Sequence, residues 1–151
     1  MSLQSIHTEQ FLPLLEQKLR EGGSVTITVT GDSMAPFLIG GRDRVTLCPI
    51  DRPLRKNDLP LYRRGDGRLI LHRVIRLARD GSLVCCGDHQ CTPERVEPEQ
   101  MLALAKGFTR KGRAFSDSSL PYRLACALWT ALFPLRGRLL VLAARRSGRK
   151  D

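Results

Sequence analysis

Residues 25–36 read Val-Thr-Ile-Thr-Val-Thr-Gly-Asp-Ser-Met-Ala-Pro. Apolar residues alternate with threonine from Val25 to Thr30, which is the period of a β-strand with one face in a core. Gly31 ends the alternation, and Ser33 follows two positions later. We therefore expect a strand that presents Ser33 at its exit, with the side chain directed into a groove.

A serine hydroxyl is a weak nucleophile until a neighbouring base removes its proton. The next histidine along the chain is His72, in Leu71-His72-Arg73-Val74. A serine at the end of one strand and a histidine inside a later strand can form a nucleophile and general base. This pair predicts a peptidase, whereas a turn serine and an interior histidine are the structural alternatives.

The rest of the chain predicts a β-rich body between helices. Phe11, Leu12, Leu15 and Leu19 recur at helical spacing, so we expect a helix over Thr8 to Glu21, ending at Gly22-Gly23. Pro13 indicates a helix start or a bend nearby. The predicted strands are Val25 to Thr30, Arg44 to Pro49, Leu59 to Arg63, Arg68 to Leu77, Ser82 to Cys86 and Leu102 to Phe108. With Gly65-Asp66-Gly67 and Asp80-Gly81 as tight turns, the expected body is a mainly β, coiled antiparallel sheet or partly open barrel.

The net charge of the 151-residue chain is +10, but the charge is unevenly distributed. Residues 1–100 hold 14 Lys and Arg against 13 Asp and Glu, and residues 101–151 hold 11 against 2. Only 5% of residues are aromatic, so the stacking pattern of a nucleic-acid binder is missing and we expect no nucleic acid as a partner. We consider three functional hypotheses. A nucleic-acid-binding or regulatory protein that uses the basic end ranks last among them.

The basic end coincides with an apolar segment, Leu120 to Ala144. Its longest uncharged run, Leu124 to Leu135, is shorter than the ~20 residues of a spanning helix. The segment is expected either to cover the sheet as a helical hairpin or to lie on an anionic membrane. We divide the chain into a body at 1–118, including the N-terminal helix, and a basic, apolar helical extension at 119–151 with a frayed tail.

The five cysteines are odd in number and lack metal-ligand spacing, which indicates reduced thiols and no metal site. No secretory signal is recognisable, and residues 1–24 carry charges where a membrane anchor would be apolar. The expected localisation is cytoplasmic or peripheral to a membrane. No residue pattern calls for a cofactor.

Five boxes in order carry a family resemblance: Gly31-Asp32-Ser33-Met34-Ala35-Pro36, Gly41 to Val45, Asn57 to Tyr62, Leu71 to Ile75 and Gly87-Asp88-His89-Gln90. Over residues 24 to 108 the chain resembles the S24/S26 serine peptidases, the group of signal peptidase I and the self-cleaving repressors. Histidine stands where lysine is usual, which is similar to the endoplasmic-reticulum and sporulation-type signal peptidases. The resemblance implies the peptidase fold of that group.

The resemblance also implies roles. Ser33 is the expected nucleophile and His72 the expected base, with Glu94 or Asp88 orienting the imidazole; that choice stays open. The Ser33 backbone N–H is the expected first oxyanion donor. Gly31, Asp32, Met34 and Pro36 are the expected substrate-binding residues, with ordinary turn and packing roles as the alternative.

The leading hypothesis is thus a serine endopeptidase that cleaves signal- or leader-like peptides, with a peptide or protein as its partner. The alternative is a catalytically inactive peptide-binding or regulatory module of the same fold. The physiological substrate, the cleavage motif and the oligomeric state have no signature in the sequence.

Overall fold

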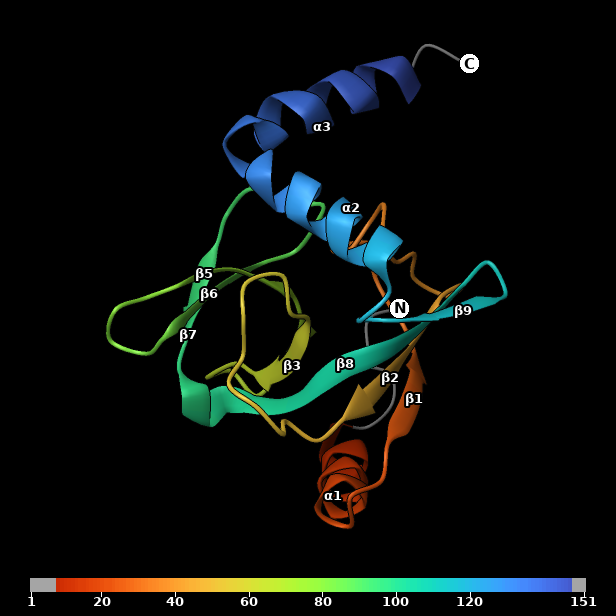
Figure 1. Cartoon of the computed structure of the whole chain (residues 1–151), viewed down its shortest axis with the longest axis vertical. Helices are drawn as coiled ribbons and strands as arrows, with labels where there is room; N and C mark the ends of the chain where they lie inside the picture. The colour runs from red at the N-terminus through yellow and green to blue at the C-terminus, as the bar shows by residue number, and fades with distance from the viewer. Residues whose placement is uncertain (1–7, 148–151) are drawn as a thin grey trace.

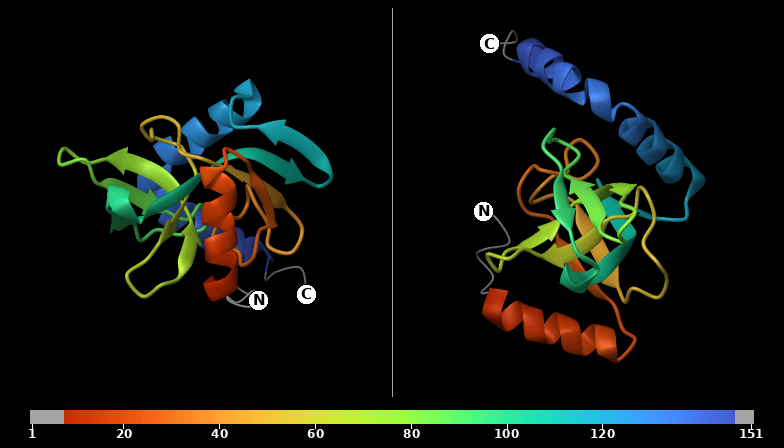
Figure 2. Two further views of the ribbon diagram at one scale, coloured as in Figure 1. Left: turned by 90° about the horizontal axis from the view of Figure 1, so that it is seen from below. Right: turned by 90° about the vertical axis from the view of Figure 1, so that its left-hand side faces the viewer.

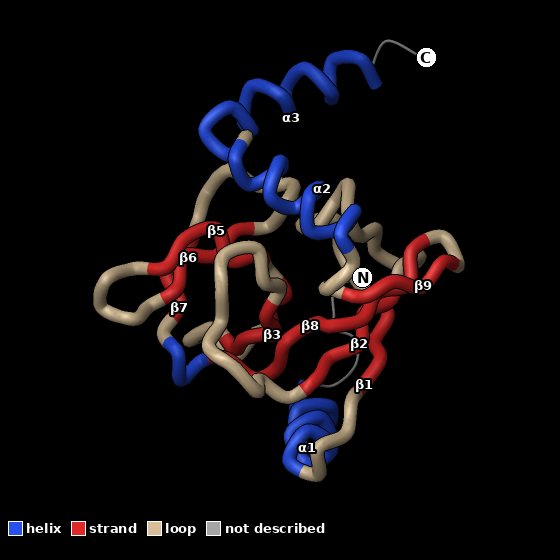
Figure 3. The backbone as a smooth tube through the Cα atoms, in the orientation of Figure 1, coloured by secondary structure: helices blue, strands red, loops and turns tan. Residues whose placement is uncertain are grey.

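The structure is a computed structural model that describes residues 8–147. Its main body is a six-stranded antiparallel sheet that curls into a half-barrel (Figures 1 and 3). The strand order is β1-β2-β8-β3-β4, and β9 pairs with β8. These strands are β1 (Val25–Thr28), β2 (Arg44–Cys48), β3 (Pro60–Arg63), β4 (Leu69–Leu71), β8 (Met101–Arg110) and β9 (Arg113–Ser116). The predicted mainly β class with a coiled antiparallel sheet is confirmed.

A second sheet of three antiparallel strands adjoins the first. It consists of β5 (Arg73–Leu77), β6 (Leu83–Cys86) and β7 (Glu94–Val96), in that order. The single strand predicted from Arg68 to Leu77 is therefore wrong, because the chain changes sheets at His72. Leu71 pairs with Leu61 of β3, whereas Arg73 pairs with Cys86 of β6. Both halves of the run are apolar enough for a buried strand, so composition alone could not locate the break.

Two short strands were missed. Strand β7 has a charged sequence with no alternation that predicts a strand, and it forms because Cys85 of β6 pairs with Glu94. Strand β9 returns along β8 after Lys111 and Gly112, which both have positive φ. Two successive positive φ values form the type I′ turn that suits the twist of a hairpin. A 3-10 helix, η2 (Pro98–Gln100), precedes β8.

The core lies inside the curl of the main sheet. Helix α1 (Thr8–Arg20) closes one end with Leu15 and Leu19, which are buried in the same core cluster as Ile27 and Val45. Pro13 lies inside the helix rather than at its start. A smaller cluster around Tyr62 and Val74, with Leu83, Cys85 and Val96, joins the two sheets. The alternation of Val25 to Thr30 is reproduced, because Ile27 and Val29 are buried and Thr26 and Thr28 are exposed.

Helices α2 (Leu120–Ala131) and α3 (Phe133–Ser147) lie at the end of the molecule opposite α1 (Figure 2). In the described residues no single helix has the length and apolarity to cross a membrane, and the two together would do so only with a 93° bend between them. Cys126, Thr130 and Arg136 are buried against the body. The extension thus packs on the body with one side, but its two helices meet at 93° and do not form the helical hairpin that one of the two alternatives predicted.

Candidate active site

Ser33 lies in the turn that follows β1. Gly31 adopts a φ of +73°, which lets the chain reverse there, and Gly40 approaches so closely that an added Cβ would meet the Gly31 oxygen at 2.6 Å. The Ser33 carbonyl accepts a hydrogen bond from the His89 N–H at 2.9 Å. In residues 8–147 the Ser33 N–H donates to no protein acceptor. This N–H is therefore available to a ligand.

Ser33 and His72 line the same pocket, which has a volume of about 190 Å³. The pocket opens between β1 and β4, the first and last strands in the order of the main sheet. Ile27 of β1 and every residue of β4 line its wall. Apart from the serine and histidine the lining is Ile27, Val29, Thr30, Gly31, Asp32, Met34, Leu69, Ile70 and Leu71. Pro36, the remaining residue predicted to bind substrate, is not in the lining. The pocket walls are mostly apolar.

Two oxygen atoms contact the His72 ring at Nδ1. Its Nδ1 lies 3.2 Å from the Tyr62 hydroxyl and 3.2 Å from Glu94 Oε1, and Tyr62 donates to the same carboxylate oxygen at 2.5 Å. Because the tyrosine proton is engaged with Glu94, both oxygens facing Nδ1 are acceptors, so Nδ1 carries the proton of the neutral ring. Nε2 then holds the lone pair. This is the tautomer that a general base at Nε2 requires.

The electrostatics keep the imidazole neutral. Burial lowers the pKa of His72 below its ordinary value, although the Glu94 carboxylate opposes the shift and Arg64 adds to it. Burial acts to raise the pKa of Glu94, but hydrogen bonds from Arg64 and Tyr62 outweigh burial and hold that pKa below its usual value. At neutral pH the site therefore pairs an uncharged His72 with an ionised Glu94.

Of the two acids proposed as the orienting group, Glu94 is the one that reaches His72. Asp88 is fully buried and accepts two hydrogen bonds from Arg73, at 2.8 and 2.7 Å. In the described residues Asp88 has no hydrogen bond to the imidazole. Gly87 and His89 flank it and contact the serine turn, so Asp88 supports the loop that holds Ser33.

Two members of the site were not found from the sequence. Tyr62 contacts both His72 and Glu94, and Arg64 forms a bidentate pair with Glu94 at 2.7 Å. The signal was the Gly65-Asp66-Gly67 turn, since a hairpin there places Tyr62 opposite Ile70 and next to His72. Glu94 comes from a third segment, β7, whose pairing no local pattern indicates.

The other reactive residue types lie outside this site. His89 and Cys91 are exposed and do not line the pocket. Burial raises the pKa of Cys85 to about 12 and that of Cys86 to about 11, so both thiols stay protonated. Asp43 is a structural residue, because it accepts hydrogen bonds from the Ile39 N–H and from Arg42 and so holds the turn after Gly41. Residues 8–147 contain no cluster of metal-ligating side chains.

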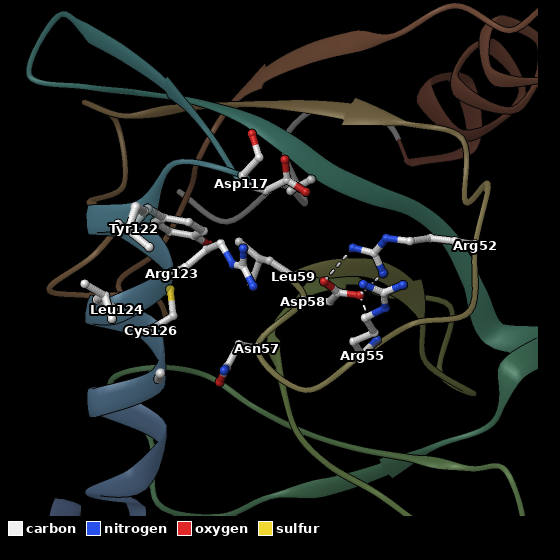
Figure 4. A pocket seen from close by; sticks show the side chains of 14 residues that line it. Arg52, Arg55, Asn57, Asp58, Leu59, Asp117, Tyr122, Arg123, Leu124 and Cys126 are labelled. Carbon is white, nitrogen blue, oxygen red and sulfur yellow. Dashed lines mark hydrogen bonds and ion pairs between the residues drawn. The ribbon is translucent and has the colours of Figure 1, made fainter.

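A larger pocket, of about 510 Å³, lies at the start of α2 (Figure 4). Among its polar groups, Arg52 pairs with both oxygens of Asp58, and the Arg55 N–H donates to the same carboxylate. It contains neither Ser33 nor His72. Its size therefore does not make it the site of the predicted chemistry.

No protein-family model matches the chain, and no curated protein or solved structure matches it either. The resemblance to the S24/S26 peptidases thus rests on the quoted residues alone.

Proposed function

We propose that this protein is a serine endopeptidase that cleaves signal- or leader-like peptides. The observation that carries the proposal is a shared pocket: Ser33 and His72, distant in sequence, both line it, while Glu94 holds the far nitrogen of His72. A nucleophile, a base with an available Nε2 and an acid behind that base are the three parts of a Ser/His/acid site.

In this mechanism His72 Nε2 accepts the proton of Ser33 Oγ as that oxygen bonds to the carbonyl carbon of the scissile peptide. The Ser33 backbone N–H donates to the oxyanion that forms. The imidazolium then gives its proton to the leaving amine, and the C–N bond breaks to leave an acyl-serine. Water, deprotonated by the same nitrogen, hydrolyses the ester. Glu94 stabilises the positive charge that His72 carries in each half of the cycle.

The sheet edges support an extended peptide as substrate. Strands β1 and β4 are the first and last strands in the order of the main sheet, and the pocket lies between them. An edge strand offers unpaired backbone groups to an incoming peptide, and alternate side chains then enter the pocket. A volume of about 190 Å³ with apolar walls suits a small side chain before the cut.

A peptide-binding module without catalysis is the second candidate. It is favoured by one observation: in residues 8–147, Ser33 Oγ forms no hydrogen bond with His72. Hydrogen bonds at catalytic sites are often loose without substrate and tighten when it binds. The geometry is thus compatible with both candidates, and activity distinguishes them.

The test is covalent labelling by a fluorophosphonate, followed by intact mass spectrometry. We expect wild type and Ser24→Ala, a control at an exposed serine, to gain one adduct. Ser33→Ala should gain none, and His72→Asn should label at least 10²-fold more slowly. Circular dichroism melts would show that each variant is folded. Equal labelling of Ser33→Ala and wild type, or no labelling of folded wild type, would exclude the peptidase proposal.

A leader-like peptide library distinguishes the second candidate. Cleavage products that depend on Ser33 support the endopeptidase. Peptides that bind but stay intact with folded wild-type protein would identify the binding module instead.

A further inference from the structure

The outward side of α2 and α3 is apolar and exposed. Seven large apolar side chains on the two helices are at least one-third exposed, with Leu124 at 62% and Leu128 at 64%. Spacings of three and four residues place the six leucines in rows along each helix, and the valine is adjacent in sequence to the last leucine. The seven are Leu120, Leu124, Leu128, Leu135, Leu139, Val141 and Leu142, which we call the α2–α3 face. Large exposed apolar side chains that gather in rows, rather than singly, mark a docking site.

Arginines border the α2–α3 face. Arg123, Arg138, Arg145 and Arg146 are exposed, and each follows a leucine of the face by three or four positions. Within residues 8–147 none of the four forms an ion pair, and the sequence has no Asp or Glu from 118 to 150. An arginine stem can lie along apolar surface while the guanidinium reaches a polar boundary. The face thus combines apolar side chains with uncompensated positive charge.

The inward side of the same helices is committed to the body. The Trp129 indole N–H donates to the Asp88 carbonyl at 3.1 Å, and Arg73 Nη1 lies 3.1 Å from Cys126 Sγ. Buried Arg136 donates to the Gly87 carbonyl at 3.2 Å. Insertion of α2 across a bilayer would break these contacts and uncover the Arg73–Asp88 ion pair. The helices therefore have one side for the body and one side for another surface.

The composition of the face distinguishes between kinds of partner. Interfaces between proteins are enriched in aromatic side chains at their centre. Here Tyr122, Trp129 and Phe133 are half-buried, and the exposed side chains are leucine, valine, alanine, proline and arginine. Leucines that enter the acyl boundary, with arginines at the level of lipid phosphates, are the arrangement of a helix lying in a membrane interface.

We propose that the α2–α3 face docks this protein on the surface of an anionic lipid bilayer, with the leucines entering the interface and the four arginines facing lipid phosphates. The 93° bend spreads the contact over two helix directions. Docking does not depend on the peptidase proposal, and Ser33→Ala is expected to bind membranes as wild type does.

The test is co-sedimentation of the full chain with vesicles. On phosphatidylcholine with one-quarter phosphatidylglycerol we expect a partition coefficient at least tenfold higher than on phosphatidylcholine alone. Raising the salt to about 0.5 M should remove most of this difference, because the Debye length shrinks well below 10 Å. Equal binding to the two compositions, or no binding to either, would overturn the proposal.

Serine substitutions test whether the leucines of the α2–α3 face contact the membrane. Leu124→Ser/Leu128→Ser/Leu142→Ser should lower partitioning at least tenfold. The matched control is Leu14→Ser/Leu77→Ser, which changes leucines that are 66% and 51% exposed on α1 and β5. We expect the control to bind as wild type does. An equal loss in both variants would show that the α2–α3 face is not the docking surface.

A second set of variants tests the contribution of the arginine charges to binding. Arg138→Gln/Arg145→Gln/Arg146→Gln should remove the preference for anionic vesicles and leave the melting temperature unchanged. Trp129 is the single tryptophan of the chain, so its emission maximum reports whether the helices stay on the body in every variant. A leucine-dependent dimer in sedimentation equilibrium, without vesicle binding, would assign the face to a second copy and overturn the proposal.

Discussion

Replacing Gly87 with alanine should displace the turn that holds Ser33 and so impair the candidate active site. An ideal Cβ on Gly87 would lie 2.6 Å from the Ser33 carbonyl oxygen and 2.9 Å from Gln90 Oε1. The glutamine side chain can rotate away. The Ser33 carbonyl is backbone and is held by the His89 N–H, so the serine turn itself must move. Gly87 does not have a positive φ, which means that alanine fits its backbone and only the contact is changed.

The size of the movement follows from the contact. Ordinary contact with a Cβ begins near 3.4 Å, so the two groups must separate by about 0.8 Å in a close-packed interior. A misplacement of about 1 Å costs roughly 10²-fold in rate, even when the cause is remote from the chemistry. Overpacking of this kind costs about 1–3 kcal/mol of unfolding free energy. We therefore expect Gly87→Ala to stay folded while fluorophosphonate labelling slows by about 10²-fold.

The matched control is Gly65→Ala. Gly65 also lacks a positive φ, and a Cβ added there would meet nothing within 4 Å. Labelling rates would be measured by mass spectrometry, with stability from thermal melts. A labelling rate for Gly87→Ala within twofold of wild type would refute the reasoning, because the serine turn would then tolerate the displacement or not set the reaction rate.

Three further predictions concern charge. Glu94→Gln should lower kcat/KM for peptide cleavage at least 10²-fold, because a side-chain amide can donate to His72 and impose the wrong tautomer; an unchanged rate would remove Glu94 from the site. Arg64→Gln should move the acid limb of the pH–rate profile to higher pH, since Arg64 lowers the pKa of His72; a limb at the same or lower pH contradicts this. Asp88→Asn should cost about 3–5 kcal/mol of unfolding free energy, because its arginine partner stays buried without a counter-charge. Asp66→Asn, in an exposed ion pair, should leave the melting temperature unchanged, and equal melting of the two variants would contradict the prediction.

The elements with a local signal were predictable. The alternation of Val25 to Thr30 places Ser33 at a strand exit. Gly22-Gly23 ends the first helix, whose last residue is Arg20, one residue before the predicted end. The Gly65-Asp66-Gly67 turn joins β3 to β4 as expected. Each of these signals depends on the conformational preferences of a few consecutive residues. They do not depend on what the segment packs against.

The candidate site was only partly predictable. Ser33 and His72 were named from the chain, and both line one pocket. The sequence left open which acid contacts the imidazole. In the structure Glu94 contacts His72 and Asp88 pairs with Arg73, and no local pattern around either acid indicates its partner. Strand pairing decides it, because β7 carries Glu94 to Tyr62.

Local patterns thus determined the mainly β class, the place of the serine and the apolar, basic character of the last third. Tertiary structure alone decided that the chain changes sheets at His72, that a tyrosine and an arginine complete the network around the imidazole, and that α2 and α3 keep one side for the body. The physical reason is the distance along the chain over which each kind of interaction acts. Backbone preferences and periodicity act over a few residues, whereas ion pairs, ring orientation and burial depend on strands that meet only after the chain has folded.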